Sequence, residues 1–181
     1  MKIVSLAFAT VFATLAATIG VAQAQSASEQ IKAKPATSET QEYLSQAAMG
    51  DLFEIQSSRL ALQQAESREV KDFADMMVKD HLEATKKLQA AAQDQNITLS
   101  PPSTLDGDHQ RKLDLLKESK GSSFDRLYIQ AQLDAHQKAL DLHRGYAKSG
   151  DNARLKQVAG EIAKVVANHL DRAKAISSGM K

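Results

Sequence analysis

The stretch that decides the fold is LKQVAGEIAKVVANHLDRAKAI, residues 155–176. The same side of a helix is occupied every seven residues by Leu155, Ile162, His169 and Ile176. Val158 and Val165 fill the neighbouring seam. An apolar repeat of this length predicts a long helix packed in a bundle, with one histidine where an aliphatic residue is expected.

Apolar spacing and capping residues predict four more helices around this one. The five expected helices span about residues 38–65, 68–95, 106–119, 122–149 and 152–177. The expected N-terminal capping residues are Ser38, Ser67, Ser122 and Asp151, with Asp125 completing a capping box after Ser122. Asn96 suits the left-handed position after the second helix, and Pro101-Pro102 mark a connector.

No segment shows strand periodicity, and 4% aromatic residues with only eight glycines argue against a β-sandwich or barrel. The connector is long, and its short helix can run back along the bundle. That arrangement would place the second and third long helices parallel. We therefore expect an all-α, ferritin-like four-helix bundle with a long crossover that contains a short extra helix.

The N-terminal segment has the pattern of a secretory signal peptide. Lys2 precedes an uncharged, mostly apolar run from Ile3 to Val21, and Ala22-Gln23-Ala24 provides a small-x-small cleavage site. We expect a Sec-type signal peptide at residues 1–24 with cleavage near Ala24, a flexible tether at 25–37 and a helical domain at 38–178. A periplasmic or secreted protein follows, with no membrane span after cleavage.

Charge and composition exclude several classes of function. Lys2 is the only charged residue before Glu29, so its removal leaves 22 of the 23 basic residues against 22 acidic ones. A neutral chain is not expected to bind nucleic acid. The absence of cysteine excludes disulfides, thiolate metal sites and a cysteine nucleophile. No phosphate-binding loop or nucleophile elbow is present, so no catalytic residue is identified and an enzyme is not the expected class.

Three histidines take core positions near the middle of three different long helices. His81 continues the pattern of Val70, Phe73 and Met77, His136 follows Ile129 and Leu133, and His169 belongs to the repeat above. His143 lies near the end of its helix, where a cation would meet the helix dipole favourably. The convergence of His81, His136 and His169 is the strongest functional signal in the sequence.

The residues also resemble a known family. The matching features are Gly50-x-x-x-Glu54, Val70-Lys71-x-Phe73-Ala74 running to Asp80-His81, Phe124-Asp125-x-x-Tyr128 before His136, and His169-Leu170. In this order and spacing they resemble the exported bacterial DUF4142 family, over about residues 39–176. The resemblance implies a ferritin-like fold and an exported protein, and it implies no reaction.

Two interpretations of the histidines remain open. In the first, Glu54, His81, His136 and His169 form a metal site, with Asp80 and Tyr128 next to it; Zn, Fe, Cu and Mn would all suit such ligands. The resemblance selects Glu54, whereas a helical wheel places Asp51 closer to the apolar stripe. A di-iron centre is not expected, because the chain has no Glu-x-x-His.

In the second interpretation, the same side chains form a buried polar network without metal. The expected function is then a non-enzymatic stress or accessory module; the alternatives are a metal-binding or redox protein and a module that binds a protein partner. Metal binding predicts that the three imidazoles converge within a coordination sphere. A network predicts that each histidine is paired to a carboxylate, hydroxyl or carbonyl. A partner-binding module predicts a contiguous exposed apolar patch.

Overall fold

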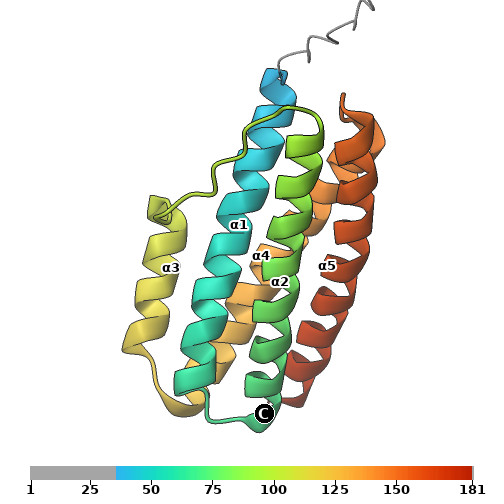
Figure 1. Ribbon diagram of the computed structural model, residues 1–181. Coiled ribbons are helices and arrows are strands. Elements are labelled where there is room, and N and C mark those ends of the chain that lie inside the picture. The colour runs from blue at the N-terminus through green and yellow to red at the C-terminus, as the bar shows by residue number, and fades with distance from the viewer. Residues whose placement is uncertain (1–35, 181) are drawn as a thin grey trace, which may run out of the picture. The chain divides into compact units, whose positions relative to one another are not determined.

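The computed structural model describes residues 36–180, which form five helices (Figure 1). The helices are α1 (Ser38–Gln64), α2 (Arg68–Asp94), α3 (Gly107–Glu118), α4 (Gly121–Ser149) and α5 (Ala153–Gly179). Residues 36–180 contain no strand, so the predicted all-α class is confirmed. The expected signal peptide and almost all of the tether lie outside the described residues.

The long helices surround a common interior in the order α1, α2, α5, α4, with each contacting the next. Asp125 at the start of α4 accepts hydrogen bonds from the backbone N–H groups of Glu66 and Ser67 in the α1–α2 turn. At the other end of α4, the Tyr146 hydroxyl lies 2.5 Å from Thr40 Oγ1 near the start of α1. Helices α2 and α4 therefore both run away from the α1–α2 turn.

The crossover is as expected for a ferritin-like bundle. Helix α3 runs back along the outside of the bundle and packs against α1 and α4 (Figure 1). It returns the chain to the end where α2 began, so that α4 starts parallel to α2. Among residues 36–180, none of the helices combines the length and apolar character needed to cross a membrane.

Local capping differs from the sequence expectation at several helix starts. Thr37, rather than Ser38, caps α1 by accepting a hydrogen bond from the Thr40 N–H at 3.2 Å. Asn152, rather than Asp151, caps α5 through the Leu155 N–H. The predicted capping box of Ser122 and Asp125 is wrong, because α4 begins at Gly121 and Asp125 instead accepts from two N–H groups of the α1–α2 turn.

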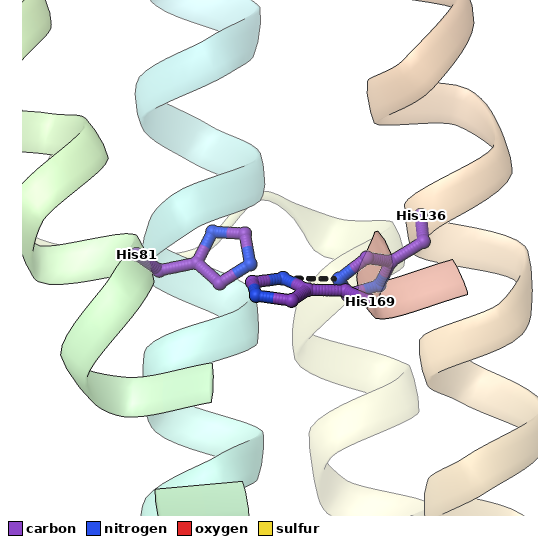
Figure 2. A group of neighbouring side chains, drawn as sticks. All are labelled: His81, His136 and His169. Carbon is purple, nitrogen blue, oxygen red and sulfur yellow. Dashed lines mark hydrogen bonds between the residues drawn. The ribbon is translucent and has the colours of Figure 1, made fainter. Parts of the chain in front are cut away.

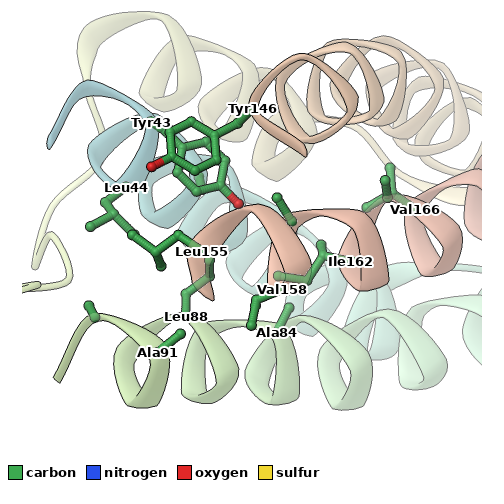
Figure 3. Packing of buried hydrophobic residues seen from close by; sticks show 14 of the residues in the cluster. Tyr43, Leu44, Ala84, Leu88, Ala91, Tyr146, Leu155, Val158, Ile162 and Val166 are labelled. Carbon is green, nitrogen blue, oxygen red and sulfur yellow. The ribbon is translucent and has the colours of Figure 1, made fainter. Parts of the chain in front are cut away.

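Two apolar clusters fill the two ends of the bundle. The first packs the start of α1 against the ends of α2 and α4 and the first half of α5 (Figure 3). The second lies near the α1–α2 turn, around Phe73, Phe124 and Tyr128. The sequence expectation fails at Val165, which is 37% exposed while Val166 is buried. A straight helix favours Val166, since eleven residues from Leu155 make three whole turns.

Candidate metal centre

A polar layer separates the two apolar clusters at mid-height in the bundle. Each long helix contributes to it: Glu54 comes from α1, His81 from α2, His136 from α4 and His169 from α5, and all four are at most 3% exposed. One nitrogen from each histidine lies within 4.8 Å of one nitrogen from each of the other two. Figure 2 shows the three side chains pointing toward one another from three helices. The structure thus brings together all four residues of the predicted site.

Asp51 is a fifth member of this layer. His81 Nδ1 donates to Asp51 Oδ1 at 2.8 Å and lies 3.1 Å from Glu54 Oε2. The hydroxyl of Thr85 donates to the other oxygen of Asp51. Asp51 and Glu54 are three residues apart on α1, so both face α2. The helical wheel favours Asp51 and the family resemblance favours Glu54. In the structure both carboxylates contact the imidazole of His81.

Burial and neighbouring charges together set the pKa values of His81 and Glu54. Burial opposes the charged form of His81, but the carboxylates of Glu54 and Asp51 outweigh it and raise the pKa of His81 to about 9. Burial raises the pKa of Glu54 to about 7, although His81 opposes the shift. His81 is therefore the cation of the apo centre.

The other two histidines have partners that define their tautomers. His136 Nδ1 lies 2.8 Å from the Gln132 carbonyl, an acceptor, so this nitrogen must be the N–H. His169 Nε2 lies 2.8 Å from Asp80 Oδ2 and donates to that carboxylate. Burial lowers the pKa of both His136 and His169, so both rings are neutral at pH 7.

These assignments leave two lone pairs facing each other. The remaining nitrogens, Nε2 of His136 and Nδ1 of His169, lie 3.4 Å apart (dashed line, Figure 2). With both rings neutral and both N–H groups used elsewhere, neither nitrogen has a proton to donate across this gap. A cation between the two nitrogens would resolve the conflict.

Two buried atoms of the layer, Nε2 of His81 and Oε1 of Glu54, also have no hydrogen-bond partner among residues 36–180. Glu54 Oε1 is 3.2 Å from His136 Nδ1, but that N–H points to the Gln132 carbonyl. Unpartnered buried polar atoms are uncommon in folded proteins. Their presence in one layer indicates that these atoms are free to bind a ligand.

The remaining residues singled out in the sequence have less direct roles. Asp80, whose side chain is 42% exposed, holds His169. Tyr128 is fully buried and hydrogen-bonds Ser58 at 2.8 Å, rather than any of the four predicted ligands. His143 is buried against the Tyr43 hydroxyl, and burial lowers the pKa of His143 to about 4. The expectation of a cation at the helix end is therefore wrong for His143.

Comparisons with known proteins agree with this architecture. Residues 19–176 match the family described as "Domain of unknown function (DUF4142)". No curated protein sequence matches the chain. A crystal structure of a DUF305 fragment from Deinococcus radiodurans superposes with a TM-score of 0.69 at 12% identity, covering 80% of this chain and 99% of that one.

Two further solved structures have the same fold. CopM in the Cu(II)-bound form has a TM-score of 0.67 at 18% identity, covering 78% of this chain and 97% of that one. CopM in the Cu(I)-bound form has a TM-score of 0.64 at 18% identity, covering 77% and 96%. At these identities the similarity shows a shared fold and nothing further.

Proposed function

Since this chain belongs to the DUF4142 family, whose function is unknown, we propose from the geometry of the centre that it is an exported, non-enzymatic protein that binds one copper ion. The proposed ligands are His81, His136 and His169, with Glu54 completing the set. Asp51 and Asp80 would orient two of the imidazoles.

The observation that supports this proposal most strongly is the pair of facing lone pairs on His136 and His169. Two nitrogens that bind one ion at ~2.0–2.1 Å lie between roughly 2.9 and 3.4 Å apart, depending on the coordination angle. The observed separation is 3.4 Å. Carboxylate and carbonyl partners on the far nitrogens are also the usual way in which proteins orient metal-binding imidazoles.

Copper is favoured over other ions by two considerations. Among divalent first-row metals, copper binds nitrogen and oxygen sites most tightly. The fold is also shared with CopM, whose solved forms contain Cu(II) and Cu(I). When bound, copper would supply a one-electron redox couple, while the chain's own residues hold the imidazoles in place.

A structural network remains the second candidate. Every histidine of the layer already has a carboxylate or carbonyl partner in the chain, which is what a network without metal predicts. In that case the layer would fix the register of the four helices, and the function would be that of an accessory module acting through its outer surface. Among residues 36–180, the large exposed apolar residues are Leu62, Leu82, Leu115, Leu127 and Val165, one on each helix.

Metal content distinguishes these two candidates. The mature protein, purified without chelator or affinity nickel, is analysed for metals, then stripped and titrated with Cu(II) and separately with Zn(II). We expect one copper ion per chain, nitrogen hyperfine structure in the Cu(II) electron paramagnetic resonance spectrum, and release of a proton from His81. In His136→Gln the copper should be lost.

The matched control is His143→Gln, which removes a buried histidine outside the layer and should keep one copper ion per chain. If the wild-type protein stays free of metal after titration, the copper proposal is wrong and the network explanation stands. Equal loading of wild type and His136→Gln would also contradict the ligand assignment.

A further inference from the structure

A pocket opens between α1, α3 and α4 and reaches the polar layer from outside. Its volume is about 310 Å³, and Asp51, Glu54 and His81 line it. Small-molecule sites are typically concave, mostly apolar and furnished with a few convergent polar groups, starting at about this volume. The pocket is the route by which a ligand could reach the centre without unfolding a helix.

The walls of the pocket are apolar over much of their extent. Ala135, Ala139 and Leu142 line it from α4, and Ala47 lines it from α1. Gly50 also lines it, and a Cβ built at Gly50 would meet nothing within 4 Å. A ligand therefore needs an apolar body to use this surface.

Positive charge at the pocket comes from two lysines on different helices. Lys112 on α3 and Lys138 on α4 both line the pocket, and neither has an acidic partner within 4 Å among residues 36–180. Asp106 also lines the pocket, but its carboxylate accepts from the backbone N–H groups of Asp108 and His109 and from the His109 ring, and from neither lysine. The lysines are thus available to an anionic group from outside the chain.

Buried groups restrict the opposite end of a ligand. The carboxylates of Asp51 and Glu54 would repel an anion, whereas Glu54 Oε1 lacks a hydrogen-bond donor. A hydroxyl or amine would satisfy it. The pocket therefore offers a hydrogen-bond acceptor, Glu54, at its buried end and two lysines, Lys112 on α3 and Lys138 on α4, to an anionic group.

We propose that this pocket binds a small organic carboxylate, whose charged group lies at Lys112 and Lys138 and whose apolar body lies along α4. A hydrogen-bond donor on the ligand would reach Glu54. This inference goes beyond metal binding and does not depend on it, because the lysines and walls are present in the apo protein.

The test uses two matched probes on the metal-free protein. 4-Hydroxybenzoate has the proposed carboxylate, body and hydroxyl, and 4-hydroxybenzamide is its neutral isostere. We expect saturable binding of 4-hydroxybenzoate by calorimetry, at least about tenfold tighter than binding of the amide. Lys112→Gln combined with Lys138→Gln should remove that preference, while Lys86→Gln on the surface of α2 should leave it unchanged.

A second pair of variants tests the location. Gly50→Leu would fill the pocket, whereas Gly145→Leu adds the same side chain on α4 outside this pocket, where a Cβ also meets nothing within 4 Å. Binding should be lost only in Gly50→Leu. The proposal is overturned if 4-hydroxybenzoate fails to bind up to its solubility limit, if both probes bind equally well, or if Gly50→Leu binds like wild type. Because the probes are tested without metal, none of these results bears on copper binding.

Discussion

Histidines that look equivalent along the sequence occupy four distinct electrostatic environments. His81 lies against two buried carboxylates and is charged, whereas His136 and His169 are neutral. His143 is buried against a tyrosine and is neutral, and His109 is partly exposed on α3. The partner atom, rather than the helix position, therefore determines which histidine must lose a proton to water before it can bind a metal.

Replacing two of these histidines with the same residue should give opposite results. His81→Leu leaves Asp51 buried without its cation and should lower the free energy of unfolding of the apo protein by about 3–5 kcal/mol. His169→Leu leaves only Asp80, which is half exposed and can be solvated, so the apo protein should change by less than about 1 kcal/mol. Urea unfolding of both variants measures this, and similar losses in the two would contradict the assigned charges.

The acid stability of the protein should depend on His143. Burial lowers the pKa of His143 to about 4, whereas the unfolded chain takes the proton near 6.5. Stability is therefore present above pH 6.5 and lost as the pH falls toward 4, with about 2 kcal/mol lost to this residue at pH 5. Unfolding at pH 7 and pH 5 should show that His143→Gln loses about that much less than wild type. Equal losses would mean that His143 is already protonated when folded.

Among the secondary-structure elements, α4 is joined to the α1–α2 turn by one side chain that accepts two hydrogen bonds. Asp125 accepts from Glu66 N–H at 3.1 Å and Ser67 N–H at 2.8 Å, whereas Ser67 itself makes no side-chain cap. Since α4 follows the crossover in sequence, this contact fixes the level at which the returning helix begins.

Removal of the Asp125 carboxylate should therefore cost more than removal of the Ser67 hydroxyl at the N-cap of α2. We expect Asp125→Ala to lower the free energy of unfolding by about 1–2 kcal/mol, because it leaves two N–H groups without an acceptor. Ser67→Ala should change it by less than about 0.5 kcal/mol. Chemical denaturation of the two variants compares them directly, and a larger loss in Ser67→Ala would reverse the assignment.

For the whole molecule, the polar layer lies between two apolar clusters and takes one or more residues from every long helix. The ligand set consequently exists only when all four helices are assembled. Copper at about a hundredfold excess over its Kd should stabilise the protein by about 2.7 kcal/mol and raise Tm by roughly 5–10 °C. Thermal unfolding at increasing copper concentrations should show this rise in wild type and no rise in His136→Gln. A rise in both would place the ion elsewhere.

Helical periodicity was sufficient to predict the fold class, the helix spans and the inward direction of His81, His136 and His169. It was insufficient for residues whose roles depend on contacts between helices. Asp125 was assigned to its own helix because the α1–α2 turn is 58 residues away in sequence. The second carboxylate on His81 is not predicted, because a helical wheel ranks Asp51 and Glu54 without showing that both contact one ring. The pocket depends on where α3 packs, which no local pattern specifies.

The pairing of His169 with Asp80 makes the two sides of the centre different. The pocket approaches it between α1 and α4, whereas Asp80 reaches water at the opposite edge, between α2 and α5. A molecule arriving on one side and a proton leaving on the other would not share a path. A change of charge at His169 would thus be balanced through Asp80, on the side of the layer away from the pocket.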